Sequence, residues 1–131
     1  HVKVGLDNMP NVVFTGPKKI TELPDYLKYF DCTIIPFVKN TLTKSIYPLK
    51  INEYLAAGRP VIAVNFSEDM YSFHDVAYVE DTHDDFIAAI DKAINENSQE
   101  KVEARMKVAA QNTWTARVAR FWDIITPPPV I

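Results

Sequence analysis

The residues best suited to bind an anion lie in a polar, basic stretch, residues 38–47, that ends at a proline. The stretch leads into a helical pattern whose first turn is Pro48-Leu49-Lys50. Free backbone N–H groups and the positive end of a helix dipole make such a junction suited to a phosphate or diphosphate. Lys44 and Lys50 would add positive charge. A solvated loop with ordinary surface lysines is the alternative, and the residues alone leave it open.

A carboxylate follows in the second turn of the same helical pattern. Glu53 stands five residues beyond Pro48, in a stretch that is otherwise mostly apolar. A carboxylate in such surroundings needs hydrogen-bond partners. Lys50 offers an ion pair worth roughly a few tenths of a kcal/mol. The 2′ and 3′ hydroxyl groups of a ribose would satisfy the same oxygens, because an ionised carboxylate only accepts hydrogen bonds.

The elements that position these residues follow from the pattern of apolar positions. Short β-rich runs alternate with amphipathic stretches of helix length, which predicts an α/β fold with a mostly parallel sheet flanked by helices. Strands are expected at residues 11–16, 32–37 and 60–65, with a shorter one at 76–79 and a further one at 2–6. Helices are expected at residues 20–30 (with Thr21 as N-cap), 48–58, 84–96, 98–111 and 114–125. Ligands of such sheets bind beyond the carboxyl ends of the strands, in the loops after residues 16, 37 and 65.

Length and composition limit the alternatives. A chain of 131 residues with 47% hydrophobic content fits a single domain. Its 14 Lys and Arg residues are spread along the chain and the net charge is −3, so no nucleic-acid partner is expected. No apolar run approaches the roughly 18–20 residues of a membrane span, which predicts a soluble, cytoplasmic protein. The chain begins without methionine and almost inside an apolar run, so we expect it to be a piece of a longer protein.

Other reactive or aromatic residues favour structural roles. Cys32 lies in an apolar run and is expected to be a small buried hydrophobe rather than a nucleophile. His74-Asp75 and His83-Asp84-Asp85 lie in turn-rich stretches, where exposed or capping roles are expected. Trp114 and Trp122 are expected to dock a terminal helix on a core rather than to stack on a ligand.

One segment also carries a family resemblance. It comprises Pro36-Phe37, Asn40, Leu42-Thr43, Pro48-Leu49-Lys50 and the run Glu53-Tyr54-Leu55-Ala56-Ala57-Gly58-Arg59-Pro60-Val61. These residues closely resemble the donor-binding domain of family 4 type glycosyltransferases of the GT-B fold. The nearest likeness is to the bacterial branch linked to cell-surface polysaccharide synthesis, including teichuronic-acid-type transferases. The resemblance covers roughly residues 10–95, and the stretch from Pro48 to Val61 is its most specific part.

The resemblance implies a domain organisation. Residues 1–131 would form part of the C-terminal, Rossmann-like domain that binds a nucleotide sugar, with residues 113–126 as a terminal helix and the N-terminal part of the domain missing. The N-terminal GT-B domain of the same chain would be a partner and would supply the acceptor site and any catalytic base. In this family the final helix packs against that domain, so an exposed aromatic patch is expected on residues 114–125. The fragment alone is predicted to be inactive.

The resemblance also implies roles for site residues. Glu53 would bind the ribose, and residues 17–19 would lie beside the base, with Pro17 and Lys18 as the predicted contacts. Many family members have a second glutamate eight positions before the ribose-binding one, where this chain has Ser45; the identity of the sugar therefore stays open. The diphosphate would be held by backbone amides near Ser45, Ile46 and Tyr47 and by those of Leu49 and Lys50, beside the charge of Lys44.

The implied reaction is transfer of a sugar from a nucleoside diphosphate sugar to a glycan or lipid-linked acceptor, with retention of anomeric configuration. It would serve bacterial surface polysaccharide synthesis in the cytoplasm, or at the inner face of the membrane, and would need neither a metal nor a cofactor. Two alternatives remain: a non-catalytic nucleotide-binding regulatory domain, and a protein-interaction domain that uses the apolar face of residues 114–125. The sequence does not decide the base, the sugar, the acceptor or the linkage.

Overall fold

The centre of the fold is a sheet of three parallel strands in a computed structural model that describes residues 5–126. The strands are β1 (Thr33–Ile35), β2 (Val61–Val64) and β3 (Tyr78–Glu80), in the spatial order β1-β2-β3. Ile34 lies opposite Ile62, and Ala63 lies opposite Val79. The observed sheet confirms the predicted α/β class.

Helices make up most of the remaining structure. They are α1 (Leu23–Leu27), α2 (Leu49–Ala56), α3 (His83–Asn95), α4 (Gln99–Gln111) and α5 (Trp114–Ile125), with short 3-10 helices η1 (Leu6–Asn8), η2 (Thr43–Ser45) and η3 (Glu68–Phe73). Thr82, Ser98 and Thr113 cap α3, α4 and α5, because each hydroxyl accepts the backbone N–H three residues further on. These local caps explain why the three helices begin within one residue of their predicted starts.

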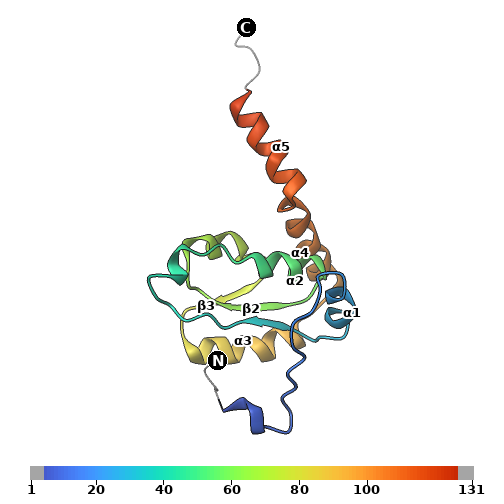
Figure 1. Cartoon of the computed structure of the whole chain (residues 1–131), viewed down its shortest axis with the longest axis vertical. Coiled ribbons are helices and arrows are strands. Elements are labelled where there is room, and N and C mark those ends of the chain that lie inside the picture. The colour runs from blue at the N-terminus through green and yellow to red at the C-terminus, as the bar shows by residue number, and fades with distance from the viewer. Residues whose placement is uncertain (1–4, 127–131) are drawn as a thin grey trace.

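The helices cover both faces of the sheet, as Figure 1 shows. Alternate residues of β2 point to opposite faces. Val61 and Ala63 join a core with Ile51 and Leu55 of α2, η3 and Ala109 of α4. On the other face, Ile62 packs against α3 through Ala89 and Ala93 and against the half-buried Cys32. The cysteine therefore has the packing role predicted for it.

A glycine ends α2 and allows α4 to pack against it. Gly58 has φ +69°, and its N–H donates to the carbonyl of Leu55 at 2.9 Å. A Cβ atom at this position would lie 2.7 Å from Cγ1 of Val102 in α4. Arg105 of α4, only 2% exposed, donates to the carbonyl of Gly58 at 3.1 Å and to Oδ1 of Asn97 at 2.8 Å. Glycine at position 58 is thus required both by the left-handed turn and by the close contact between α2 and α4.

The strand predicted at residues 11–16 is not formed. This segment has no regular secondary structure, and Val13 and Phe14 are 81% and 64% exposed. A strand needs a neighbour to pair its N–H and C=O groups, and no strand in residues 5–126 lies along this segment, so its β propensity alone is not enough. Of the strand expected at residues 2–6, positions 2–4 lie outside the described residues, and Leu6 begins η1.

Other boundaries differ by a few residues. The first helix is shorter than predicted and begins at Leu23; Thr21 does not cap it, and the Glu22 carboxylate instead accepts the N–H of Lys19 at 2.8 Å. Pro48 occupies the N-cap position of α2 rather than its first turn. The last strand begins two residues later than the predicted 76–79 and ends one residue later, because the turn that ends η3 uses the N–H groups of Val76 and Ala77.

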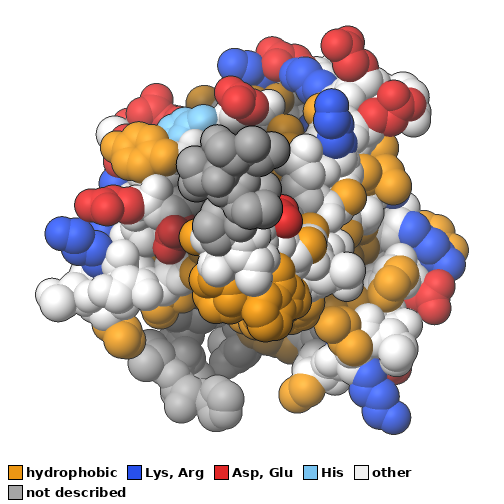
Figure 2. All heavy atoms as spheres, turned by 90° about the horizontal axis from the view of Figure 1, so that it is seen from above, with side chains coloured by type: hydrophobic (Ala, Val, Ile, Leu, Met, Phe, Trp, Pro, Cys, Tyr) orange, Lys and Arg blue, Asp and Glu red, His pale blue; other side chains and the backbone are white. Residues whose placement is uncertain are grey.

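Helix α5 projects away from the sheet (Figure 1) and contains no buried residue. Trp114 and Trp122 are 81% and 55% exposed, so they do not dock the helix on the core formed by residues 5–126. Figure 2, which views the molecule from the side where α5 projects, shows hydrophobic side chains gathered there. This agrees with the exposed aromatic patch expected on residues 114–125, whose other exposed apolar side chains are Val118, Phe121, Ile124 and Ile125. Among the described helices, none has the length and apolar character needed to cross a membrane.

Candidate functional site

The carboxyl ends of the three strands are joined by polar side chains. Lys39, beyond β1, donates to Oδ1 of Asp81, which directly follows β3, at 2.6 Å and to the carbonyl of Asp81 at 3.2 Å. Asn65, which directly follows β2, donates its side-chain N–H to the same carboxylate at 3.3 and 3.4 Å. These contacts hold the loops after β1 and β2 together at the edge where ligands of parallel sheets bind.

Asp81 provides a test of this linkage. The hydrogen bond from Lys39, followed by that from Asn65, lowers the pKa of Asp81 below its ordinary value of 3.8. A carboxyl group with a lowered folded-state pKa stabilises the fold above its unfolded pKa, and this contribution is lost as the pH falls through the folded pKa. We expect Lys39→Met to raise the pKa of Asp81 towards 3.8, as followed by carboxyl ¹³C chemical shifts in an NMR pH titration. Lys44→Met, which removes a lysine without an ion pair in residues 5–126, is the control; an equal rise in both variants would contradict the linkage.

Residues 38–47, which we call the edge loop, are organised by their own hydrogen bonds. Oδ1 of Asn40 accepts the N–H groups of Leu42 and Thr43, each at 2.9 Å. The Thr43 hydroxyl donates to the carbonyl of Val38 at 2.6 Å. Asn and Thr commonly stabilise such turns because their short side chains reach nearby backbone groups. The loop that leads into α2 therefore has a defined shape.

The edge loop leaves two of the predicted diphosphate-binding amides free. The N–H groups of Ser45, Ile46 and Leu49 donate to the carbonyls of Leu42, Thr43 and Tyr47 at 3.3, 3.0 and 3.0 Å. The hydrogen bonds of residues 5–126 leave the N–H groups of Tyr47 and Lys50 without an acceptor. An anion at the start of α2 would therefore meet these two donors first.

Glu53 carries an available carboxylate. Its side chain is half-buried in α2 and forms no hydrogen bond or ion pair within residues 5–126, so the possible pair with Lys50 is not formed. Burial raises the pKa of Tyr54, and the charge of neighbouring Glu53 raises it further. Because the Glu53 carboxylate has no partner within residues 5–126, both of its oxygens are free to accept hydrogen bonds from a ligand.

A cation from the C-terminal helix also reaches the start of α2. Arg117 of α5 donates to the hydroxyl oxygen of Tyr47 at 2.6 Å, and its guanidinium lies 4.7 Å from the centre of the Tyr47 ring. Asn52 donates to the same hydroxyl at 3.1 Å. Sequence reasoning did not find Arg117, since 70 positions separate it from Tyr47 and no local pattern connects them.

A pocket of about 370 Å³ opens beside the edge loop, and we call it the edge pocket. The sequence predicted that the loop after residue 65 borders the ligand crevice, but it did not indicate which residues of that loop line a pocket. The edge pocket is lined by Lys39, Asn40 and Lys44 of the edge loop, by residues 65–68 after β2, and by Tyr71 of η3. Lys44 is thus common to this pocket and to the predicted phosphate-binding stretch.

The structure does not bring Pro17 and Lys18 to this site. The Lys18 ammonium group lies 5.2 Å from the centre of the Tyr26 ring in α1. The end of α1 is held near the amino ends of the strands, because Arg59, just before β2, donates to the carbonyl of Phe30 at 3.0 Å. Figure 1 shows α1 at the opposite end of the sheet from the edge loop. The base-binding role of residues 17–19 stays a prediction.

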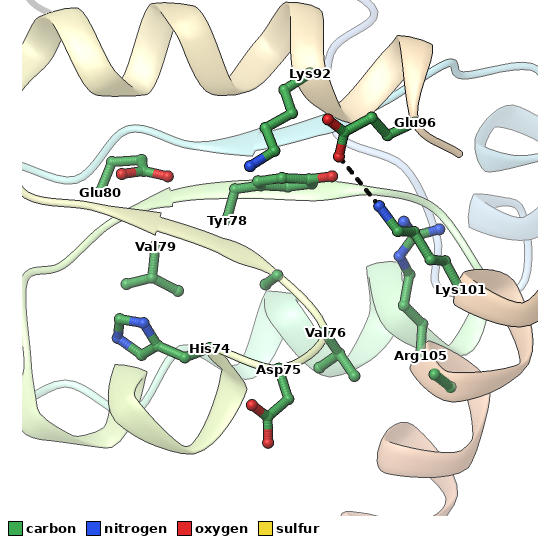
Figure 3. Close-up of a pocket in the computed structure, with 12 residues that line it drawn as sticks. His74, Asp75, Val76, Tyr78, Val79, Glu80, Lys92, Glu96, Lys101 and Arg105 are labelled. Carbon is green, nitrogen blue, oxygen red and sulfur yellow. Dashed lines mark hydrogen bonds and ion pairs between the residues drawn. The ribbon is translucent and has the colours of Figure 1, made fainter. Parts of the chain in front are cut away.

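A second cavity, of about 450 Å³, lies near the amino end of β3 (Figure 3). Lys101 forms an ion pair with Glu96 at 3.3 Å, and Lys92 lies 5.8 Å from the centre of the Tyr78 ring. The buried cation of this cavity, Arg105, is already used to hold the end of α2. These contacts favour a structural role for the cavity.

The two histidines within residues 5–126, His74 and His83, belong to separate contacts. The His74 ring stacks on Tyr71 at 5.4 Å, and Nδ1 of His83 lies 3.8 Å from the carboxylate of Asp84, with both side chains exposed. Within residues 5–126 no three His, Cys, Asp or Glu side chains are grouped as potential metal ligands.

Comparisons with known proteins place this geometry in context. Residues 1–96 match the model of a family described as "Glycosyl transferases group 1". The chain is 36% identical over 110 residues to TuaH of Bacillus subtilis (strain 168), whose description assigns it provisionally to teichuronic acid biosynthesis as a glycosyltransferase. The matched region covers 81% of this chain and 28% of that relative, so the chain spans under a third of the relative's length. A search of solved structures gave no significant match.

Proposed function

Because the chain belongs to the group 1 glycosyl transferases, we propose that its carboxyl-edge site binds the nucleoside diphosphate sugar from which the complete enzyme transfers a sugar. One observation carries the proposal. The free amides of Tyr47 and Lys50 and the unpaired carboxylate of Glu53 all belong to the first two turns of α2 or the residues just before it. These groups match a diphosphate and a ribose, which are adjacent parts of one ligand.

In this proposal the site stabilises the leaving group. Negative charge develops on the diphosphate as the glycosidic bond breaks. Fixed donors aimed at this charge lower the barrier because they need no reorganisation during the reaction. Lys44 and Lys50, which flank this junction in the sequence, and Arg117, which contacts the Tyr47 side chain, would add positive charge, while Glu53 would orient the nucleotide through its ribose.

The remainder of the reaction belongs to parts of the protein other than this site. We propose that the acceptor is a glycan or lipid-linked acceptor in bacterial surface polysaccharide synthesis, in line with the description of the TuaH relative as a teichuronic acid biosynthesis glycosyltransferase. We also propose that the anomeric configuration is retained, as the resemblance to family 4 type glycosyltransferases implies. A second domain of the same protein would supply the acceptor site, and the exposed aromatic patch on α5 would face it. Transfer would occur in the cytoplasm, or at the inner face of the membrane. The chain by itself should bind the donor without transferring the sugar.

An NMR titration of the chain with UDP, GDP, ADP and TDP tests the donor site. We expect one nucleotide to shift the amide signals of residues 44–54 with a Kd of about 1 mM, because half of a two-domain site does not enclose its ligand. Inorganic pyrophosphate is the control and should shift the signals of Tyr47 and Lys50 but not that of Glu53. Failure of all four nucleotides to produce saturable shifts would overturn the proposed function.

A further inference from the structure

The edge pocket contains polar groups that the fold itself leaves unused. Ser67 is 6% exposed and lines the pocket, and its hydroxyl has no hydrogen-bond partner in residues 5–126. An unpartnered buried hydroxyl destabilises a fold, because it loses its hydrogen bonds to water and gains none. Ser67 precedes η3 without capping it, so helix capping does not account for this hydroxyl.

Two further pocket groups can accept hydrogen bonds. The exposed carboxylate of Glu68 forms no ion pair or hydrogen bond within residues 5–126. Asn65 donates its side-chain N–H to Asp81, and its carbonyl oxygen accepts no hydrogen bond from the described residues. Lys44 also lines the pocket, and its ammonium group forms no ion pair within residues 5–126, whereas that of Lys39 is paired with Asp81.

The pocket also has aromatic walls. Phe66 is 4% exposed and packs on Phe37 with the ring centres 4.9 Å apart. Tyr71 is 67% exposed and is held by stacking on His74. One wall is therefore apolar and fixed, and a second presents an accessible aromatic ring.

These features fit a ring that carries hydroxyl groups. Each sugar hydroxyl both donates and accepts, so it suits a pocket with a free carboxylate, a free ammonium group and an unpartnered hydroxyl. A simple anion would be repelled by Glu68, and an apolar ligand would leave Ser67 and Glu68 without partners. The pocket volume of about 370 Å³ lies within the roughly 300–1,000 Å³ of small-molecule sites.

We propose that the edge pocket binds the sugar ring of the donor and that Glu68 and Ser67 recognise its hydroxyl groups. This inference rests on the proposed function, because Lys44 connects the pocket to the stretch assigned to the diphosphate. Glu68 would then provide, from the loop after β2, a carboxylate on the sugar side of the site, where position 45 of the edge loop offers only a serine.

Glu68→Gln tests the assignment, because it keeps the shape of the side chain and removes its charge. The chain is titrated by NMR with UDP-glucose, UDP-galactose, GDP-mannose and TDP-glucose, each compared with its own nucleoside diphosphate. We expect one sugar nucleotide to bind about tenfold more tightly than its nucleoside diphosphate, and this ratio to fall close to one in Glu68→Gln, since a hydrogen bond to a charged group is lost. Asp69→Asn is the matched control: its carboxylate is the next in the chain but does not line the pocket.

The outcomes separate the two proposals. The proposed sugar pocket alone would be overturned if a nucleoside diphosphate binds but Glu68→Gln leaves the ratio of sugar-nucleotide to diphosphate affinity unchanged. The same conclusion would follow if all four sugar nucleotides bind no better than their parent diphosphates. Absence of all binding would overturn the proposed function as well.

Ser67→Ala supplies a second readout. The variant should unfold a few degrees higher than the parent chain without ligand, because it removes a buried unpartnered hydroxyl. It should also lower the affinity ratio about threefold. A gain in stability without any change in the ratio would show that Ser67 has no part in sugar binding.

Discussion

Glu53→Ala is expected to lower the affinity of the chain for its nucleoside diphosphate about 100-fold, a loss of about 3 kcal/mol. Two hydrogen bonds from ribose hydroxyl groups to a charged acceptor account for this magnitude. NMR titration detects the loss, because a parent Kd of about 1 mM would rise so far that the titration no longer saturates. Folding should be unaffected or slightly improved, because the Glu53 side chain has no partner in residues 5–126 and alanine favours a helix.

Two variants make this result specific. Glu53→Gln keeps the size of the side chain and should recover only part of the affinity, because a neutral amide accepts hydrogen bonds more weakly than a carboxylate. Glu103→Ala, at an exposed position of α4, should bind nucleotide like the parent. Equal binding by the parent and Glu53→Ala would remove Glu53 from the site, whatever the nucleotide.

Gly58→Ala is expected to destabilise the chain by about 3 kcal/mol. The left-handed conformation at φ +69° costs a non-glycine residue about 1–2 kcal/mol, and overpacking adds roughly 1–3 kcal/mol. The overpacking arises because the added Cβ would lie 2.7 Å from the Val102 side chain. Urea unfolding followed by circular dichroism measures the loss.

Gly16→Ala separates the two contributions. Gly16 has φ +67°, but a Cβ there would meet nothing within 4 Å, so only the backbone cost of about 1–2 kcal/mol is expected. Equal destabilisation by both substitutions would mean that α4 shifts freely and that the contact with Val102 adds nothing.

The predictable parts of the fold are those with local causes. The starts of α3, α4 and α5 follow from hydroxyl caps three residues from the N–H groups they accept. The run at residues 11–16 has a strand-like composition, but pairing depends on a distant segment, and no strand of residues 5–126 lies beside it. Thr21 fails as a cap for a different reason: the residue three positions further on is Pro24, which has no N–H to donate, and α1 begins at Leu23 with Glu22 at the N-cap position.

The candidate site divides in the same way. The position of Glu53 and the basic edge loop were visible as a pattern within about fifteen consecutive residues. The turns of the edge loop decide which backbone N–H groups remain free. The sequence therefore could not show that the N–H of Ile46 is used within the loop while that of Tyr47 is not. Arg117 and the edge pocket arise from segments brought together only by folding.

The contact between Arg117 and Tyr47 has a consequence for communication within the protein. It connects α5, which lacks any buried residue, to the N-terminal end of α2. A phosphate that draws the guanidinium away from Tyr47 would loosen this hold on α5. By thermodynamic reciprocity, a partner that repositions α5 would change phosphate affinity by the same factor. Under the proposed function, occupancy of the nucleotide site and the orientation of the projecting helix would be coupled through the guanidinium group of Arg117.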